Sequence, residues 1–551
     1  MTSAGSNEAA LGRTKPVAAR ASSWSATNRP AIGSSLDGYQ LATARRSIGW
    51  ETIVDTVASG SPLAGRDHRP RSGPTAPRTG PRMPIVQRPS AGASLLGGSI
   101  VLPVNECHHD VPQQSVSPWT GEPGTAGVVA VVGAGKMGLP LAAQFAGHGW
   151  KVIAVDVQPA VVAAINEGRS HLGEEPGVAE LVARSHAEGR LRATTDGATA
   201  ARDADVVVLI VPVMLDAGHQ PDYRYMDAAV DSIAGGLHDG SLVVFETTLP
   251  VGDTRGRYQP RLEAASGLHT ETDLFVAFSP ERLYSGAVLR NLSSYPKLVG
   301  GLGPASTERA ARFYDSVLDA EIVAMSSAEA AEFSKLADTT YRDVNIALAN
   351  EYAAYADRVG VDIREVIEAA NSQPYSHIHQ PGIGVGGHCI PVYPHFLLSR
   401  APELTLVARS REVNDGQIQI ALASVRDSLG GLDGAPVLVL GLTYRHGVNE
   451  LAYSRALPLI EALAAAGARV SAFDPLMTDA EIRAVGAAPY AWGTTSDARA
   501  IVTQTGDPQW LSLDPAWFPD LALLVDGRNT LAGLTLPEHV RYRGIGVPRR
   551  G

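Results

Sequence analysis

The stretch from Val128 to Asp156 constrains the fold more than any other part of this 551-residue sequence. An apolar run, Val128-Val-Ala-Val-Val132, leads directly into Gly133-Ala-Gly-Lys-Met-Gly138, and a second apolar run, Lys151-Val-Ile-Ala-Val155, follows. A strand that runs into three glycines at this spacing and then into a helix is typical of a parallel α/β sheet. Backbone N–H groups at the start of such a helix can hold a pyrophosphate.

Asp156 ends the second run, about 20 residues after the glycines, where an acidic side chain accepts hydrogen bonds from the ribose hydroxyls of NAD. The same carboxylate would repel the additional phosphate of NADP. The alternative is that the glycines only let the strand and the helix pack closely. We expect NAD as the cofactor, with a binding site formed by Gly133, Gly135, Lys136, Met137, Gly138 and Asp156.

Short β-branched runs alternate with Ala-rich amphipathic stretches after Gly127, which predicts strands and crossover helices. The strands expected first are 128–132, 151–155, 205–211, 241–246 and 274–278. A long helix is expected over 328–359, followed by a second α/β set with strands at 435–441 and 469–475 and a helix near 454–466. The sequence therefore predicts an α/β protein with two Rossmann-like, doubly wound domains, 126–326 and 433–551, joined by a central helical domain, 327–432.

Residues 1–125 differ from the rest, because they are rich in Ser, Pro, Gly, Ala and Arg and show little hydrophobic periodicity. Such a segment buries too little apolar surface to offset its ordering entropy, so we expect a disordered extension. A tail for an anionic partner, or translation from a misassigned start codon, are the alternatives. The net charge of −11 comes from the chain after residue 125, because the extension carries more Lys and Arg than Asp and Glu.

The chain has two cysteines, Cys107 and Cys389, too few for a disulfide framework, which favours a reducing cytoplasm. Its longest apolar run, 206–215, is too short for a membrane helix of roughly 20 residues, and the N-terminus lacks the apolar core of a secretory signal. We expect a cytoplasmic protein without a bound metal and without nucleic acid or a membrane as partner.

Cys389 lies in Pro381-Gly-Ile-Gly-Val-Gly-Gly-His-Cys-Ile-Pro-Val-Tyr-Pro394, where four glycines let the backbone fold tightly around one thiol. A cysteine in such a loop is a candidate nucleophile. The alternative is a small buried hydrophobic residue. The neighbouring His388 either tunes the thiol or only packs nearby.

Two further groups of polar residues are candidates for a site. Lys335, Thr339 and Arg342 are spaced to form one polar stripe on the long helix, and a solvated helix face is the ordinary interpretation of that spacing. Glu281 follows the strand at 274–278, at the end where open α/β sheets bind ligands, and is a candidate base. A surface carboxylate is the alternative there.

Residues 127–551 contain seven motifs in the order that is typical of the UDP-glucose/GDP-mannose dehydrogenase family, and so resemble that family. The residues of these motifs are most similar to those of its UDP-N-acetylhexosamine branch. The motifs are Val132-Gly-Ala-Gly-Lys-Met-Gly138, Glu246-Thr-Thr-Leu-Pro-Val-Gly252, Ser279-Pro-Glu-Arg282, the segment from Lys335 to Glu351, Gly384-Val-Gly-Gly-His-Cys-Ile-Pro391, Gly441-Leu-Thr-Tyr-Arg445 and Asp526-Gly-Arg-Asn529. The resemblance implies NAD-dependent oxidation of a nucleotide sugar to its uronic acid, in polysaccharide biosynthesis, by a homodimer or higher oligomer packed through the central helices.

The resemblance also implies roles for individual residues. Cys389 forms a thiohemiacetal and then a thioester, Lys335 steadies the oxyanion, and Glu281 with Thr248 orders or deprotonates the hydrolytic water. Thr248 is also expected at the cofactor. The expected contacts to the UDP-sugar come from Glu281, Arg282, Lys335, Thr339, Gly386 and Arg445.

Three positions depart from the usual pattern of the family. Tyr393 stands where an aspartate usually follows the cysteine by four residues, Thr339 replaces an asparagine, and Arg445 replaces a lysine. The changes at Tyr393 and Thr339 leave open a catalytically silent nucleotide-sugar-binding protein. A second alternative is a single-step NAD dehydrogenase of the β-hydroxyacid type, which would share the first domain and the helical core but would not need Cys389. Because Cys389, Lys335 and Glu281 are all present, we interpret the departures as divergence in substrate.

Overall fold

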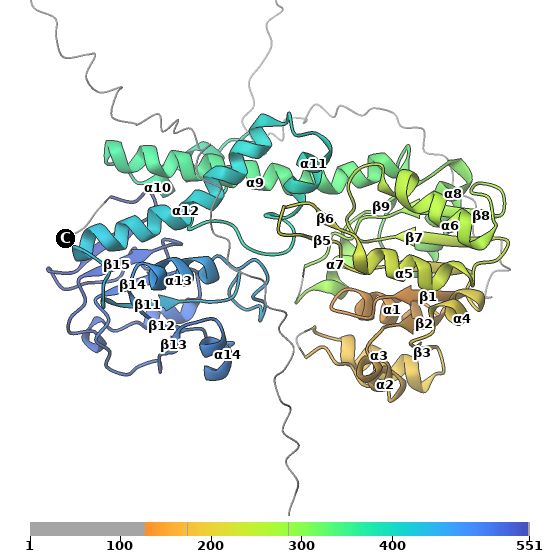
Figure 1. Ribbon diagram of the computed structural model, residues 1–551, viewed down its shortest axis with the longest axis horizontal. Helices are drawn as coiled ribbons and strands as arrows, with labels where there is room; N and C mark the ends of the chain where they lie inside the picture. Colours follow the sequence, from red (N-terminus) through yellow and green to blue (C-terminus); the bar gives the residue numbers. More distant parts are fainter. Residues whose placement is uncertain (1–126, 174, 285, 549–551) are drawn as a thin grey trace, which may run out of the picture. The chain divides into compact units, whose positions relative to one another are not determined.

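The computed structural model describes residues 127–173, 175–284 and 286–548, so the expected disordered extension lies outside the described residues. Within these ranges the chain forms one sheet of eight strands, ordered β10-β9-β8-β7-β4-β1-β2-β3, and one of six, ordered β13-β12-β11-β14-β15-β16. In both sheets the chain winds outward in two directions from a central strand, β1 or β11, and helices flank the strands (Figure 1). This confirms the predicted α/β class with two doubly wound sheets.

The first sheet is parallel except where β8 and β9 pair antiparallel. Its strands are β1 (Val128–Val132), β2 (Lys151–Val155), β3 (Leu191–Thr194), β4 (Val206–Leu209), β7 (Ser241–Phe245), β8 (Leu274–Phe278), β9 (Lys297–Gly301) and β10 (Ile322–Ala324). The central strand β4 is buried at every position, because a parallel sheet is covered on both faces. The accompanying helices are α1 (Gly138–Gly147), α2 (Pro159–Asn166), α3 (Val178–Ala187), α4 (Gly197–Arg202), α5 (Arg224–Ala234), the π-helix η2 (Thr254–Tyr258), α6 (Gln259–Ser266), α7 (Val288–Ser294) and α8 (Pro304–Val317), and a short hairpin joins β5 (Met214–Leu215) to β6 (Pro221–Asp222).

The second sheet is parallel throughout. It consists of β11 (Pro436–Leu440), β12 (Arg469–Phe473), β13 (Ala488–Pro489), β14 (Ala500–Thr503), β15 (Leu523–Asp526) and β16 (Arg541–Gly544). Its helices are α13 (Ala456–Ala465), α14 (Asp479–Ala484) and the short 3₁₀ turns η3 (Pro508–Ser512) and η4 (Pro515–Trp517).

Four helices lie between the two sheets in the sequence: α9 (Ala328–Val359), α10 (Ile363–Asn371), α11 (Tyr393–Arg400) and α12 (Thr405–Leu429). The 32-residue α9 begins where the Ser327 side chain accepts a hydrogen bond from the Ala330 N–H, and it ends at Gly360 in the left-handed conformation. It packs along α12 and against α11 (Figure 1). The bounds of α9 are those that the sequence predicts.

The two faces of α9 have an unusual composition. Its buried face is made of small and polar residues: Ala328, Ala331, Glu332, Lys335, Leu336, Thr339, Thr340, Asp343, Ala347, Ala349, Asn350, Ala353 and Ala356. Leu336 is the large apolar residue of the buried face, whereas six others are exposed: Phe333, Tyr341, Leu348, Tyr352, Tyr355 and Val359. The apolar periodicity that predicts this helix therefore does not mark its packing against the rest of the chain.

Elements with strongly apolar sequences were predicted well, and their ends differ from the predicted ends by two residues or fewer. Strand 205–211 is β4, Val206–Leu209, and strand 435–441 is β11, Pro436–Leu440. The prediction omitted several short strands, including β3, which alternates buried and exposed residues, and the edge strand β16, Arg-Tyr-Arg-Gly. Edge and half-exposed strands carry too few consecutive apolar residues to stand out in the sequence.

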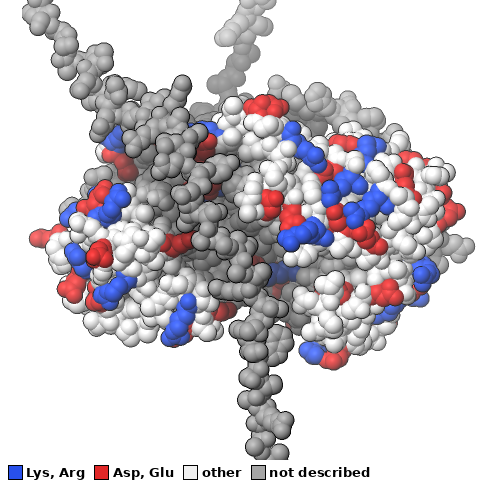
Figure 2. All heavy atoms as spheres, viewed as in Figure 1, with Lys and Arg blue, Asp and Glu red and all other residues white. Residues whose placement is uncertain are grey.

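Acidic and basic side chains are interspersed on the face that Figure 2 shows. On the first sheet's helices, Arg257 pairs with Asp227 at 2.5 Å and Arg261 with Asp231 at 2.6 Å. No helix among the described residues is long and apolar enough to cross a membrane. Residues 127–548, apart from 174 and 285, contain no cluster of three His, Cys, Asp or Glu side chains that could hold a metal ion.

Candidate active site

The cysteine loop is anchored at its start by a buried polar network between α9 and α12. Arg411 on α12 pairs with Asp343 on α9 at 2.6 Å, and Asn414 donates a hydrogen bond to the same carboxylate. Asn414 in turn accepts one from Asn350, whose side-chain oxygen accepts the Gly382 N–H at 2.9 Å. These hydrogen bonds connect α9, α12 and the start of the cysteine loop, so the network fixes where the loop leaves the helices.

Gly384 shows why the loop requires glycine. Its φ is +75°, and a Cβ there would stand 2.9 Å from Nε of Arg455 and 3.2 Å from the carbonyl oxygen of Asn414. A side chain would therefore be strained in its backbone conformation and would also collide with neighbours. The loop ends at Cys389, whose carbonyl accepts the N–H of Tyr393 at the start of α11.

Charged groups from separate segments converge on the Cys389 thiol. Burial raises the pKa of this thiol above its ordinary value, while Lys335 and Arg342 on α9 act in the opposite direction. Glu281 also raises the thiol pKa, and a hydrogen bond with the Tyr393 hydroxyl lowers it. The structure thus brings together Cys389, Lys335 and Glu281, which lie more than 50 residues apart in the sequence.

Two of the three residues of the polar stripe on α9 are buried at the site, and the third, Arg342, is half-buried. Lys335 and Thr339 are 5% and 2% exposed, so the interpretation of a solvated helix face is wrong. The Lys335 ammonium lies 5.9 Å from the centre of the Tyr393 ring. The Thr339 hydroxyl donates to the carbonyl oxygens of Lys335 and Leu336 in its own helix, which occupies the proton that it could offer to a substrate.

Thr248 and Glu281 follow two neighbouring strands of the first sheet, β7 and β8. The backbone N–H of Glu281 donates to the carbonyl of Glu246, which joins the two segments. Glu332 on α9 accepts hydrogen bonds from the N–H groups of Gly252 and Thr254 and so fixes the loop that carries Thr248. The Thr248 side chain is buried and hydrogen-bonds to the Tyr393 hydroxyl.

Arg282, Gly386 and Arg445, the other residues expected to bind the substrate, differ in their contacts and exposure. The Arg282 guanidinium donates to the carbonyl of Pro296. Gly386 packs against Tyr444, where a Cβ would meet the Tyr444 Cβ at 3.0 Å. Arg445 is exposed and lies next to the Tyr444 ring, after β11.

The glycine turn after β1 has the geometry that a dinucleotide needs. Gly133 has a φ of +97°, and a Cβ on Gly138 would stand 1.7 Å from the Gly133 carbonyl oxygen, so neither position tolerates a side chain. Gly135 is exposed with open space where a side chain would be, which lets a pyrophosphate approach its backbone. The Asp156 carboxylate follows β2 and accepts the N–H groups of Ala134 and Gln158 at 3.0 and 2.9 Å. These residues fit NAD.

Glu450, which the sequence did not single out, connects the glycine turn to the cysteine loop. Its carboxylate pairs with the Lys136 ammonium at 2.6 Å and lies 3.5 Å from Nε2 of His388. These two contacts, with that of His388 the stronger, lower the pKa of Glu450 to about 2. His388 therefore faces Glu450 rather than only filling space beside the thiol. The sequence gives no signal for this contact, because its members are far apart and belong to no shared motif.

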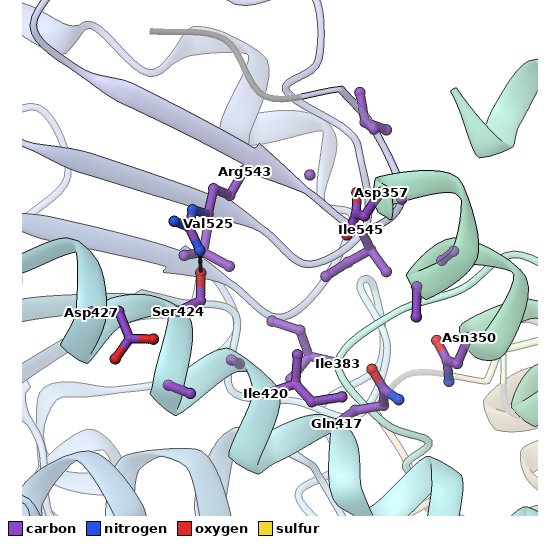
Figure 3. Close-up of a pocket in the computed structure, with 17 residues that line it drawn as sticks. Asn350, Asp357, Ile383, Gln417, Ile420, Ser424, Asp427, Val525, Arg543 and Ile545 are labelled. Atoms are coloured by element: carbon purple, nitrogen blue, oxygen red, sulfur yellow. Dashed lines mark hydrogen bonds between the residues drawn. The ribbon is translucent and has the colours of Figure 1, made fainter. Parts of the chain in front are cut away.

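A separate cavity of about 340 Å³ lies between α9, α12 and the end of the second sheet (Figure 3). In this cavity Arg543 donates a hydrogen bond to Ser424, and Asp357 and Asp427 line its wall. Its lining does not include Cys389, Lys335 or Glu281. The cavity is therefore distinct from the thiol site.

Three models of one family match the chain in succession. They describe the NAD binding, central and UDP binding domains of the UDP-glucose/GDP-mannose dehydrogenase family, and they match residues 128–318, 329–416 and 438–533. The chain belongs to this family. It is an NAD-dependent nucleotide-sugar dehydrogenase, which confirms the function class and the cofactor predicted from the sequence.

Individual relatives agree with this assignment. A UDP-N-acetyl-D-mannosamine dehydrogenase of Pyrococcus horikoshii is 33% identical over 76% of this chain and 99% of its own, and the solved structure of that enzyme superposes with a TM-score of 0.69. An NDP-N-acetyl-D-galactosaminuronic acid dehydrogenase of Ralstonia nicotianae is 36% identical over 61% of this chain and 79% of its own. A UDP-glucose dehydrogenase structure from Pyrobaculum islandicum, at 25% identity, covers 78% of this chain and all of its own with a TM-score of 0.68.

Proposed function

We propose that this protein oxidises the C6 hydroxymethyl group of a UDP-N-acetylhexosamine to a carboxylate, with Cys389 as the covalent nucleophile. The observation that carries the proposal is the convergence of Lys335 and Glu281 on the Cys389 thiol. Two relatives are named as a UDP-N-acetyl-D-mannosamine dehydrogenase and an NDP-N-acetyl-D-galactosaminuronic acid dehydrogenase, and both names support the N-acetylhexosamine class.

The first oxidation converts the C6 alcohol to an aldehyde. A hydride leaves C6, and the hydroxyl proton leaves the oxygen. NAD bound at the glycine turn supplies the hydride acceptor. The buried ammonium of Lys335 stabilises the negative charge that develops on the C6 oxygen, and such fixed charge acts strongly where water is excluded.

The second oxidation passes through Cys389. Its thiolate adds to the aldehyde carbon and the carbonyl electron pair moves to oxygen, giving a thiohemiacetal whose C6 loses a second hydride to become a thioester. Glu281, with Thr248, then takes a proton from water, the resulting hydroxide attacks the thioester carbon, and the C–S bond breaks to release the thiolate. One alcohol and one water thus give one carboxylate, two hydrides and three protons.

The nucleotide sugar is held, in this proposal, between the thiol site and the second sheet. Gly386 offers its backbone to the ligand, and Arg445 offers a cation after β11. Arg282 and Thr339 contribute to the wall of the sugar site. Arg445 presents a planar, bidentate donor, which favours a phosphate contact more directional than that of a lysine.

The test is the ratio of NADH to sugar acid on a panel of UDP-, GDP- and dTDP-sugars. The proposal expects two NADH per sugar, with UDP-N-acetylhexosamines preferred. Cys389→Ser should still bind NAD but lose sugar-acid production by several orders of magnitude, and Cys107→Ser is the matched control. One NADH per substrate, or full two-step turnover by Cys389→Ser, would contradict the covalent route.

We further propose that two copies of the chain pair along α9. The exposed residues Tyr341, Leu348, Tyr352, Tyr355 and Val359 follow one another at spacings of seven, four, three and four residues. This spacing keeps them in one seam, the pattern by which helices pair in coiled coils. An apolar seam on the exposed side of a helix whose other side is already packed supports a homodimer, which light scattering tests directly.

We also propose that the reaction takes place in the cytoplasm and supplies uronic-acid donors for polysaccharide biosynthesis. The chain has an NAD binding domain, and its Cys389 thiol is free. A free nucleophilic thiol persists best in a reducing compartment such as the cytoplasm. Fractionation of cells that express the protein tests the location.

A further inference from the structure

Tyr393 occupies the position, four residues after the cysteine, at which the family usually has an aspartate. Its N–H donates to the carbonyl of Cys389 at 3.0 Å, which closes one helical turn at the start of α11. Residues four apart in such a turn lie on the same side of the backbone. The Tyr393 side chain is therefore directed toward the thiol.

The phenol of Tyr393 is held by contacts from three segments. Its hydroxyl hydrogen-bonds to the side chains of Cys389 and Thr248, and its ring packs against Phe396 with centroids 5.4 Å apart. The Lys335 ammonium approaches the same ring. These contacts come from α9, from α11 and from the segment after β7, and they keep the phenol at the thiol site.

The direction of the hydrogen bonds follows from the ionisation of the phenol. Burial raises the pKa of Tyr393 well above its ordinary value, so the hydroxyl keeps its proton. A thiolate has no proton and can only accept, so the phenolic proton is directed to Cys389 when the thiol ionises, and the phenolic oxygen can then accept from Thr248. The relay therefore runs from the Thr248 hydroxyl through Tyr393 to the Cys389 sulfur.

An aspartate could not do the same at this position. An ionised carboxylate only accepts hydrogen bonds, and it would add a negative charge beside the thiolate. The other groups that face the thiol are Lys335 and Arg342 from α9, Glu281 from the segment after β8, and Tyr444 from the segment after β11. Among them Glu281 already disfavours the thiolate.

We propose that Tyr393 is a catalytic residue of this chain that donates its hydroxyl proton in a hydrogen bond to the Cys389 thiolate, a task that an aspartate cannot perform. The proposal rests on the proposed function in taking Cys389 as the nucleophile. The hydrogen bond stabilises the thiolate before it adds to the aldehyde, and again when the C–S bond of the thioester breaks. The phenolic proton stays on Tyr393 throughout.

The first experiment measures the thiol without any turnover. The rate of iodoacetamide alkylation of the free enzyme is followed from pH 7 to 10 in a Cys107→Ser background, with Cys389→Ser as the blank. Loss of one hydrogen bond to a charged group should raise the apparent pKa of Cys389 by about one unit in Tyr393→Phe, so that alkylation at pH 8 slows about tenfold. Tyr393→Asp should slow it further, because it adds a like charge.

Two further variants make the result specific. Tyr490→Phe removes a buried phenol of the second sheet, which donates to the Thr494 carbonyl and has no contact with the thiol site, and should leave the alkylation profile unchanged. Thr248→Val keeps Tyr393 but removes the donor to its oxygen, and should shift the profile in the same direction by a smaller amount. It also serves as the test if Tyr393→Phe fails to fold. Equal alkylation rates for the parent, Tyr393→Phe and Thr248→Val would overturn the proposal.

Turnover then separates this proposal from the function itself. Tyr393→Phe should lower kcat for sugar-acid formation about tenfold or more and leave the KM for NAD unchanged, because the phenol touches the sulfur and not the glycine turn. If Cys389→Ser retained full turnover, the covalent function would be wrong whatever the alkylation profile showed. If Cys389→Ser is inactive but Tyr393→Phe alkylates and turns over like the parent, only the role of Tyr393 is wrong.

Discussion

Replacement of Asp156 by alanine should weaken NAD binding and reduce the discrimination against NADP. The carboxylate is partly buried at the end of β2, where it accepts the N–H groups of Ala134 in the glycine turn and of Gln158. An acidic side chain at this place in a dinucleotide-binding fold would accept hydrogen bonds from the adenosine ribose hydroxyls. Asp156→Ala removes both the support of the turn and the acceptor for the ribose.

The size of the effect follows from the kind of hydrogen bond that is lost. A hydrogen bond to a charged group contributes about 1.5 kcal/mol at the lower end of its range, so two ribose hydroxyl bonds amount to about 3 kcal/mol. Since each 1.4 kcal/mol is about a factor of ten, the KM for NAD should rise roughly 100-fold. NADP gains from the loss of a repulsive charge, so the preference for NAD should fall by at least about tenfold.

Initial rates with NAD and NADP at saturating sugar nucleotide measure both quantities. Asp203→Ala is a suitable control, because it removes an exposed carboxylate of the same domain whose partner is Arg192. The control should change neither KM nor cofactor preference. A KM for NAD within twofold of the parent, with an unchanged preference, would refute the assignment of Asp156.

Three other perturbations have defined outcomes. Gly384→Ala should lower the free energy of unfolding by more than Gly360→Ala, because both have φ near +75° but only Gly384 would also collide with neighbours; equal losses in urea titrations would contradict the crowding at the cysteine loop. Tyr352→Glu should convert the dimer to monomers in light scattering, whereas Tyr225→Glu, on the exposed face of α5, should not. Glu450 titrates at about 2 in the folded protein against an ordinary value of 4.5, so its stabilising effect is complete above about pH 4.5 and declines as the pH falls toward 2. The difference in unfolding free energy between the parent and Glu450→Gln should therefore be smaller at pH 3 than at pH 7, and a constant difference would contradict the ion pairs.

The sequence predicts those parts of the fold that a short, strongly patterned segment determines. The glycine turn and its two strands are local, and their apolar runs are unbroken, so their limits follow from the residues themselves. Apolar residues at helical spacing also predict the long helix, and the structure shows that it begins after Ser327 and ends at Gly360, two capping signals that the prediction did not use. Short edge strands such as β16 depend on a neighbour for their stability, and no local pattern reveals that neighbour.

The site required information that spacing alone does not contain. Lys335 and Thr339 have the periodicity of a solvated stripe, yet they are buried because the cysteine loop and α11 cover them. Periodicity alone predicts a solvated helix face for these residues, whereas the resemblance to the family predicts that they belong to the active site. The sequence shows that Tyr393 replaces the usual aspartate of the family, but only the folded structure shows that its hydroxyl contacts the Cys389 thiol.

The burial of Cys389 has a consequence for the survival of the enzyme under oxidative stress. Peroxides attack thiolates, and they oxidise exposed cysteines of low pKa to sulfenic and then irreversible sulfinic acids. In this protein the partly buried surroundings of Cys389 raise the pKa of its thiol above the ordinary value, so the resting enzyme keeps most of its nucleophile protonated. Inactivation by hydrogen peroxide should accordingly be slow in the absence of substrate, and slower than the inactivation of enzymes whose exposed catalytic cysteine has a low pKa.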